Sequence, residues 1–170
     1  VVVWLTSCAK LPETVISDAV SCSEGFVHEL EYEGVKDIRV VDAVQYVADE
    51  VLPIMSGLPK VASAALHPTC SSTRMGWNDS LQRCAEAVAD EVVVADAWGC
   101  CGFAGDRGLL HPALTKSATR REATELAKRE FDLYLSANRT CELGMERATG
   151  KPWRHALSVL AERMVEYAPA

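Results

Sequence analysis

Short runs of apolar, β-branched residues alternate along the chain with longer segments whose apolar residues recur at helical spacing. The strand-like runs cover residues 14–17, 38–41, 61–66, 91–95 and 133–135, and the helix-like segments cover residues 43–55, 79–89, 112–131 and 153–167. Strands that alternate with helices of this length are typical of βαβ units. The pattern therefore predicts an α/β fold with a mainly parallel sheet and helical crossovers. Asp42 is expected to cap the helix that begins at Ala43.

The chain also contains an internal repeat. Residues 17–26 resemble residues 136–145, because both read as a strand end, a polar turn and a Cys-x-x-Gly motif that begins at Cys22 or Cys141. A second pair of segments, 43–50 and 156–163, match in pattern and occur in the same order. Two matched blocks in one order predict a duplication.

The two copies differ in what precedes the Cys-x-x-Gly motif. Only 21 residues precede Cys22, whereas a long stretch with further cysteines precedes Cys141. We therefore expect tandem modules, with residues 1–58 the C-terminal remnant of a truncated first module and residues 59–170 a complete second one. The chain begins Val1-Val2-Val3 rather than with Met, which agrees with the expectation that it is part of a longer protein.

Composition and charge narrow the functional classes. The formal net charge of −7 argues against a nucleic-acid-binding surface. The densest basic stretch, residues 116–129, is interleaved with glutamates, which is typical of a solvated helix face. No apolar run approaches the length of a membrane span, and no secretory signal is visible. Seven cysteines without such a signal indicate reduced thiols in the cytoplasm, where they commonly serve as metal ligands or redox centres.

Three cysteine positions follow three predicted strands. Cys70 follows strand 61–66, Cys100 and Cys101 follow strand 91–95, and Cys141 follows strand 133–135. The carboxyl ends of parallel strands share one edge of a sheet, so these four thiols are expected to converge. The gaps of 29 residues between Cys70 and Cys100, and of 39 between Cys101 and Cys141, each suit one helical crossover.

Four thiolates at one site suit zinc or an iron–sulfur cluster. Adjacent cysteines reach two irons of a cluster more easily than one tetrahedral ion, so the cluster is favoured. Gly102 and the other glycines of the loop would let the backbone approach a cluster and donate N–H groups to its sulfurs. Zinc, a thiol–disulfide centre and plain buried thiols remain as alternatives.

Other cysteines and histidines lie outside this pattern. Cys84 is expected to pack in the core and Cys8 to be structural. His67 is expected either to hydrogen-bond beside the metal site or to shape the turn before Cys70, while His28 and His155 are expected at the surface. No Ser-His-Asp arrangement, phosphate loop or dinucleotide fingerprint is visible, so the chain alone has no recognisable site for oxidising a substrate.

Three segments resemble the cysteine-rich CCG domain: His-Pro-Thr-Cys at 67–70, Trp-Gly-Cys-Cys-Gly-Phe-Ala-Gly-Asp-Arg-Gly at 98–108, and Ser-Ala-Asn-Arg-Thr-Cys-Glu-Leu-Gly-Met at 136–145. That domain occurs in heterodisulfide reductase, in iron–sulfur subunits of glycolate and lactate oxidases, and in anaerobic glycerol-3-phosphate dehydrogenase. The segments look most similar to the C-terminal region of FAD-linked D-lactate and D-2-hydroxy-acid dehydrogenases. Those enzymes fuse a flavin domain, a ferredoxin-like segment and paired CCG modules.

The resemblance implies a [4Fe–4S] cluster held by Cys70, Cys100, Cys101 and Cys141. It also implies FAD in an upstream domain, and electron relay from that flavin to an acceptor such as a quinone or a cytochrome. The larger enzyme would lie in the cytoplasm or at the periphery of the inner membrane. Cys22 would be the closing metal ligand of the first module, with its partner ligands upstream.

One position departs from the pattern of the family. Some CCG domains end in Cys-x-x-Cys, whereas Gly144 stands three residues after Cys141 here, which favours a four-thiolate cluster over a non-cubane one. The alternatives are an iron–sulfur component like those of heterodisulfide reductase or glycolate oxidase, and a non-enzymatic docking module stabilised by a metal.

Overall fold

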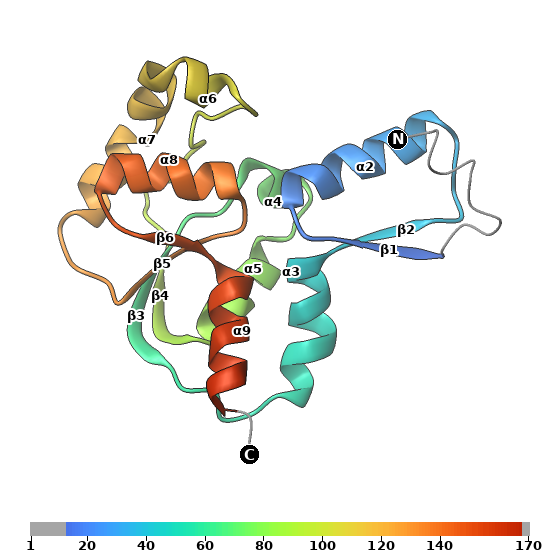
Figure 1. Cartoon of the computed structure of the whole chain (residues 1–170), viewed down its shortest axis with the longest axis horizontal. Helices are drawn as coiled ribbons and strands as arrows, with labels where there is room; N and C mark the ends of the chain where they lie inside the picture. The colour runs from blue at the N-terminus through green and yellow to red at the C-terminus, as the bar shows by residue number, and fades with distance from the viewer. Residues whose placement is uncertain (1–12, 168–170) are drawn as a thin grey trace.

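Two parallel sheets form the framework of the chain, as the hydrophobic pattern predicted (Figure 1). The structure is a computed structural model and describes residues 13–167. The smaller sheet pairs β1 (Thr14–Ser17) with β2 (Arg39–Asp42). The larger sheet has the order β4-β3-β5-β6, with β4 at Ala89–Val93, β3 at Val61–Leu66, β5 at Leu133–Ser136 and β6 at Trp153–His155. All of these pairings are parallel.

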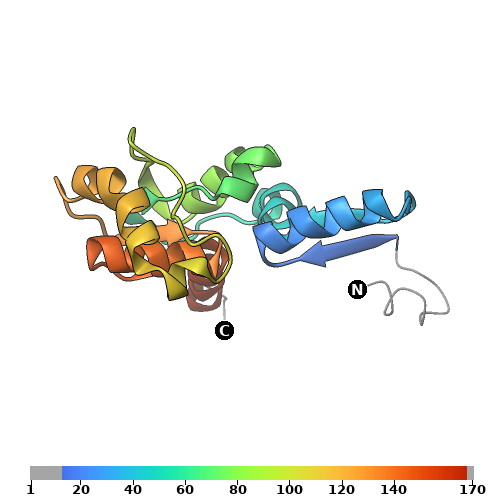
Figure 2. The ribbon, with the colours of Figure 1, turned by 90° about the horizontal axis from the view of Figure 1, so that it is seen from above.

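Helices connect the strands and cover both faces of the larger sheet. They are α2 (Val20–Tyr32), α3 (Ala43–Tyr46), α4 (Cys70–Arg74), α5 (Asn78–Glu86), α6 (Arg107–Leu110), α7 (Pro112–Leu126), α8 (Arg139–Thr149) and α9 (Ala156–Tyr167). Viewed from above, β1 and α2 project away from the larger sheet and its helices (Figure 2). No helix of the described residues is long and apolar enough to cross a membrane.

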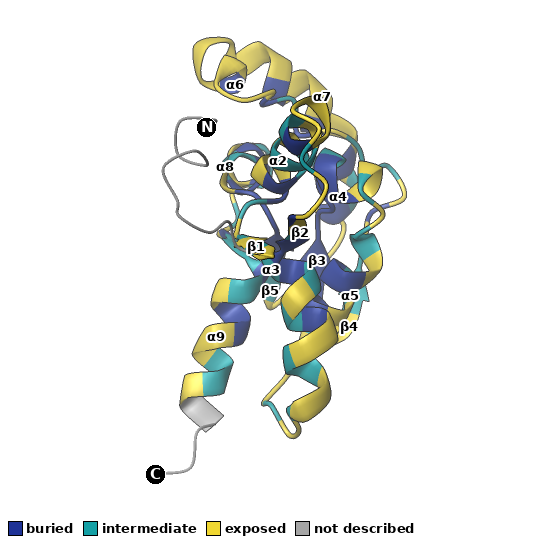
Figure 3. Ribbon diagram, turned by 90° about the vertical axis from the view of Figure 1, so that its right-hand side faces the viewer, coloured by how far each residue is buried: buried dark blue, intermediate teal, exposed yellow. Residues whose placement is uncertain are grey.

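Side chains that alternate along the strands divide the core between the two faces. Ala64, Leu66 and Leu135 point to one face and pack with α3, α5 and α9. Ala65 and Tyr134 point to the other face and pack with residues of α7, α8 and β6. Figure 3 shows buried residues gathered in the middle of the molecule, around β3 and β5, and the outer surfaces of α6, α7 and α9 as exposed.

Several element boundaries differ from the predictions. β4 begins and ends two residues earlier than expected, because Val88 and Ala89 are already buried. The long helix ends at Leu126 rather than at residue 131. The helix that begins at Ala43 changes to a π-helical turn at Val47–Val51 and then to a 3₁₀ turn at Leu52–Ile54. The α-helix ends here because Pro53 has no N–H to donate to the carbonyl one turn before. Residues 153–155, predicted as helix, form β6.

The internal repeat has a structural counterpart. Elements β1, α2, β2 and α3 (the first βαβα unit) follow the same order as β5, α8, β6 and α9 (the second βαβα unit). Ser17 pairs with Asp42 in the first unit, and Ser136 pairs with His155 in the second. The two units share one hydrophobic core that joins α3 to α9. The division of the chain at residue 58 stays a prediction.

The helices that follow these strand pairs are capped in the same way. Oδ1 of Asp42 accepts a hydrogen bond from Val44 N at 2.9 Å, as the sequence predicted. Nδ1 of His155 accepts one from Leu157 N at 3.2 Å. His155 is therefore a partly buried capping residue rather than the surface residue that the sequence suggested.

Candidate metal centre

Cys70 is positioned by the turn that joins β3 to α4. It is the first residue of α4, and Thr69 caps that helix. Thr69 Oγ1 accepts a hydrogen bond from Ser72 N at 3.0 Å, while Ser72 Oγ accepts one from Thr69 N at 3.0 Å. This capping box holds Cys70 one turn beyond the carboxyl end of the central strand β3.

Cys100 and Cys101 lie in the loop between β4 and α6, which two contacts fix. Trp98 Nε1 donates to Pro68 O at 2.7 Å, which ties the loop to the turn before Cys70. The backbone N–H groups of Asp96 and Ala97 donate to the Glu125 carboxylate at 2.8 and 2.9 Å. Glu125 was expected on a solvated helix face, and the structure shows it holding the cysteine loop to α7.

Gly102 is required by the path of this loop. Its φ is +72°, and an added Cβ would lie 2.9 Å from Leu114 O and 2.8 Å from Ala118 Cβ. Any larger residue would push the loop away from α7. The Gly102 N–H also donates to Cys100 Sγ at 3.3 Å, which is the kind of contact expected of a backbone that surrounds a metal–sulfur site.

Cys141 reaches the same place from α8. It is the third residue of that helix, and its Sγ lies 3.2 Å from Cys101 Sγ. Gly144, one turn later, faces Cys101, because an added Cβ would lie 3.3 Å from the Cys101 Cβ. The helical Cys-x-x-Gly motif thus places a thiol at the site and lets the cysteine loop pack against α8.

The structure brings Cys101 and Cys141 together, while Cys70 and Cys100 interact with each other and with that pair by charge but lie outside the group of ligand atoms within 4.8 Å. Cys101 and Cys141 are buried, Cys70 is partly exposed and Cys100 is exposed. Burial, and then a hydrogen bond to Cys100, raise the pKa of Cys70 to about 11, and Cys101 adds to this effect by its charge. The fold therefore joins two of the four sulfurs directly and places the other two near them, while the role of all four as ligands stays a prediction.

The two buried sulfurs differ strongly in proton affinity. The hydrogen bond from Cys141 lowers the pKa of Cys101 to about 4, with burial opposing and hydrogen bonds from His67 and the Phe103 backbone assisting. The same hydrogen bond to Cys101, together with burial, raises the pKa of Cys141 far above its ordinary value. Cys101 is accordingly the more acidic of the two thiols, and thiolate is the form of cysteine that binds metals.

His67 and Glu122 form a buried pair beside these thiols. His67 Nδ1 lies 2.8 Å from Glu122 Oε1, and both side chains are at least 97% buried. Burial alone would lower the pKa of His67, but the hydrogen bonds to Cys101 and Glu122 outweigh it and raise that pKa to about 9. The His67 Nε2 atom is buried and makes no hydrogen bond with regular geometry.

Among residues 13–167, one group of side chains lies close enough together to hold a metal ion. It consists of His67, Cys101 and Cys141, whose ligand atoms all lie within 4.8 Å of one another. The sequence placed His67 next to the site but left its role open. Glu122 was wrongly interpreted as part of a solvated helix face, and its burial at the middle of α7 could not be read from the surrounding arginines.

The remaining cysteines lie elsewhere. Cys22 is exposed on α2 and does not belong to the metal-binding group. Cys84 is fully buried in the core, as expected, and burial raises its pKa to about 12. Cys8 lies outside the described residues. His28 is exposed, as predicted.

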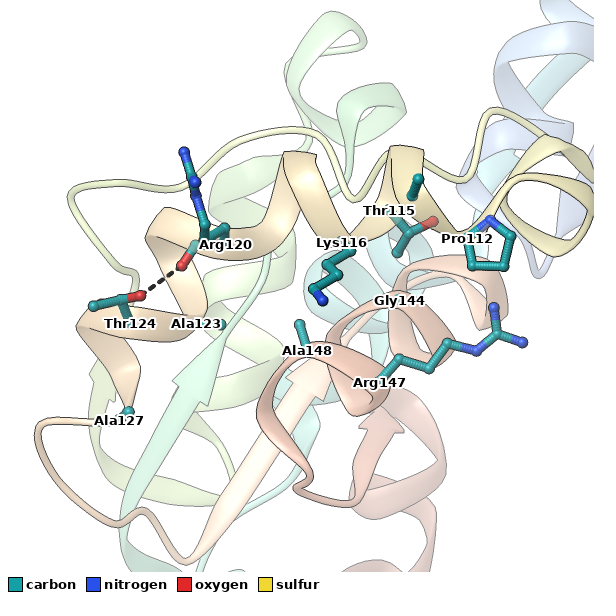
Figure 4. A pocket seen from close by; sticks show the side chains of 11 residues that line it. Pro112, Thr115, Lys116, Arg120, Ala123, Thr124, Ala127, Gly144, Arg147 and Ala148 are labelled. Carbon is teal, nitrogen blue, oxygen red and sulfur yellow. Dashed lines mark hydrogen bonds between the residues drawn. The ribbon is translucent and has the colours of Figure 1, made fainter.

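A groove of about 820 Å³ runs between α7 and α8 and backs onto the site at Gly144 (Figure 4). Small residues line it, and three cations, Lys116, Arg120 and Arg147, carry side chains at its edges. Arg147 donates to Gly108 O at 3.3 Å and lies over the Phe103 ring. The groove therefore presents positive charge beside the cysteine site in a chain whose net charge is negative.

Comparison with known families agrees with this geometry. The family model of the cysteine-rich domain CCG matches residues 64–146. The matched segment contains all four converging cysteines, His67, Glu122 and Gly144. Comparison with curated protein sequences gave no match.

Proposed function

Residues 64–146 belong to the CCG cysteine-rich domain family, and from this premise we propose that the chain binds a [4Fe–4S] cluster and relays electrons through it. The observation that carries the proposal is the convergence of Cys70, Cys100, Cys101 and Cys141 from three strand ends. Four thiolates are the usual ligand set of such a cluster.

The residues around the cysteines fit a cluster. When bound, the cluster would supply one-electron transfer. The Gly102 N–H already points at Cys100 Sγ, and the Phe103 N–H stabilises the negative charge on Cys101. Two buried and two more exposed thiols would leave one side of the site close to solvent, where an electron donor or acceptor can approach.

The larger enzyme is proposed to be a flavin-linked D-2-hydroxy-acid dehydrogenase, with D-lactate as the first candidate substrate. Support comes from the resemblance of the segments around Cys100 and Cys141 to such enzymes. FAD in an upstream domain would accept the hydride, and the cluster would pass single electrons to a quinone or a cytochrome. The cations along the groove support an approach by negatively charged groups on the acceptor.

Native protein that contains this chain provides the test. D-lactate added without oxygen is expected to reduce the cluster, which is seen as the appearance of an EPR signal, while L-lactate gives none. A cluster that dithionite reduces but D-lactate does not would remove the substrate from the proposal and leave the electron relay. Native protein without bound flavin would contradict the dehydrogenase assignment.

A second candidate function, a non-enzymatic docking module stabilised by one metal ion, is favoured by the compact group of His67, Cys101 and Cys141. Zinc commonly binds such a mixture of imidazole and thiolate. Metal analysis separates the two functions, because this candidate predicts one zinc per chain and no inorganic sulfide.

A further inference from the structure

We propose that His67 binds the metal directly through Nε2, together with Cys101 and Cys141, and that Glu122 holds the imidazole in the orientation for binding. The proposal rests on the metal-binding function proposed above and names the atoms of the chain that would bind the metal. It adds a nitrogen ligand to a site that the sequence describes by thiols alone.

The first argument is the position of the three side chains. His67 lies at the end of β3, Cys101 in the loop after β4 and Cys141 in the first turn of α8, so three separate elements direct them to one point. Their ligand atoms lie within 4.8 Å of one another, and all three residues are buried. A separation of this size lets three atoms contact one metal with small side-chain adjustments.

The second argument is the hydrogen bond on the far side of the imidazole. Nδ1 of His67 lies 2.8 Å from the Glu122 carboxylate, which accepts a hydrogen bond, so Nδ1 carries a proton. A metal that binds at Nε2 would take the place of any proton on that atom. Metal-binding histidines almost always donate their second N–H to a carboxylate or a carbonyl, which fixes the ring and increases its basicity. The Glu122 carboxylate has no other ion-pair or hydrogen-bond partner among the described residues.

The third argument is that Nε2 is fully buried and interacts with the Cys101 sulfur without a hydrogen bond of regular geometry. Buried polar atoms in native proteins are almost always satisfied, so an exception requires an explanation. A metal held by Cys101 and Cys141 would supply the missing partner.

The histidine is also held too firmly to turn away. Its backbone N–H donates to Leu135 O at 2.8 Å, and its carbonyl accepts from Ser136 Oγ at 2.9 Å. The ring makes an edge contact with Trp153 at a centroid distance of 6.2 Å. These contacts preset the imidazole before any metal arrives, which is the arrangement that a ligand requires.

A neutral imidazole ligand would change the chemistry of the site. Histidine in place of thiolate lowers the negative charge around the iron, and such ligation is associated with higher reduction potentials.

Pulsed EPR of the reduced cluster, in protein labelled with ¹⁵N-histidine, tests the inference on the unmodified chain. We expect a strong coupling to one ¹⁵N nucleus, which disappears in H67Q and persists in H28Q, whose histidine is exposed. A cluster without strong ¹⁵N coupling in the unmodified chain would overturn the inference, and this outcome needs no variant to fold. If the chain binds zinc instead of iron, zinc-edge X-ray absorption gives the same readout, with histidine scattering expected and all-sulfur scattering contradictory.

E122Q distinguishes a positioning role from a structural one. With glutamine at residue 122 the hydrogen bond to Nδ1 is weaker, so we expect the ¹⁵N coupling to change and the reduction potential to shift while the cluster remains. An unchanged coupling and potential would assign Glu122 to the stability of the fold alone. A chain that takes up no metal at all would instead contradict the proposed function, which keeps the two failures distinct.

Discussion

The two βαβα units share a backbone plan but only one of them has a cysteine site. Cys22 and Cys141 are each the third residue of the first helix in their unit, and Gly25 and Gly144 are each the sixth. Cys22 is exposed, whereas Cys141 lies 3.2 Å from Cys101. A Cβ on Gly25 would meet nothing within 4 Å, whereas one on Gly144 would lie 3.3 Å from Cys101, Phe103 and Thr115.

The difference arises from the neighbouring elements rather than from the unit itself. In the second unit, β5 pairs with β6 on one side and with β3 on the other, and β3 carries His67 and Cys70 at its end. In the first unit, β1 pairs with β2 alone among the described residues, and Ile16 of β1 is 51% exposed. A βαβα unit thus places one thiol at a sheet edge, and the adjoining strands decide whether that thiol belongs to a metal site.

Replacement of the two equivalent cysteines should give the largest difference in metal binding between the two units. C141S removes a buried thiol next to Cys101, and we expect metal affinity to fall by more than about 100-fold, since loss of a ligand exceeds loss of a hydrogen bond to one. C22S should retain the full iron content, because Cys22 touches no part of the site. Iron and sulfide analysis after anaerobic reconstitution checks both, and equal losses in the two variants would contradict this account.

Replacement of the two equivalent glycines should separate the units by stability. G25A places a good helix former at an exposed position and should stabilise the chain by about 0.5–1 kcal/mol. G144A gains the same helix propensity but crowds Cys101 and Phe103, so we expect a net loss of about 1 kcal/mol. Urea unfolding of the metal-free chain measures the two free energies. A G144A variant as stable as G25A would show that the packing around Cys101 is loose.

The two capping residues provide a smaller contrast. Asp42 is 1% exposed, caps α3 and accepts from Ser23 Oγ at 2.6 Å, whereas His155 caps α9 with one hydrogen bond of 3.2 Å. We expect D42A to cost about 1–2 kcal/mol and H155A about 0.5 kcal/mol of unfolding free energy. Equal losses of unfolding free energy in the two variants would contradict the claim that burial makes the Asp42 cap the stronger one.

Asp42 should also make the stability of the chain depend on pH. Burial raises the pKa of Asp42 above its ordinary 3.8, against the opposing hydrogen bonds from Ser23 and Val44. The native state therefore favours the protonated acid, so the stability that Asp42 contributes is full below pH 3.8 and is lost as pH rises through the raised pKa. Relative to D42N, the wild-type chain should lose stability over that range in urea unfolding. A difference that is constant with pH would contradict the sign.

Charges along the groove next to the second unit should affect electron transfer by the smallest factor. In K116E/R120E, we expect oxidation of the reduced protein by anionic ferricyanide to slow by about tenfold at low salt and oxidation by cationic hexaammineruthenium(III) to quicken. Both effects should shrink as salt screens the charges. Stopped-flow rates that are unchanged for both oxidants would show that electrons leave the site on another side.

Sequence patterns predicted much of this fold for clear reasons. Strand 61–66 was predicted at its observed bounds because Val61 to Leu66 is a short apolar run that ends at His67-Pro68, and the Asp42 cap was predicted from local chemistry. β6 was missed because three residues at a sheet edge have no period to detect, and Trp153 was assigned to the following helix. Helices α2 and α8 were not predicted, although each contains one copy of the Cys-x-x-Gly motif.

The cysteines of the candidate site were predicted from the pattern of strands, whereas its other residues were not. Convergence of the four cysteines followed from parallel strands that share an edge. The buried pair of His67 and Glu122 could not be predicted, because it joins a strand end to the middle of a helix 55 residues later. Such a contact depends on which face of α7 meets the sheet.

The central claim, that four cysteines converge to hold an iron–sulfur cluster, is tested most directly by metal and sulfide analysis together with Mössbauer spectroscopy of the 170-residue chain reconstituted without oxygen. Our account predicts about four iron and four sulfide per chain, with the spectrum of a [4Fe–4S] cluster that is lost in C100S. A chain that holds one zinc and no sulfide, and that binds zinc equally well in C100S, would contradict it.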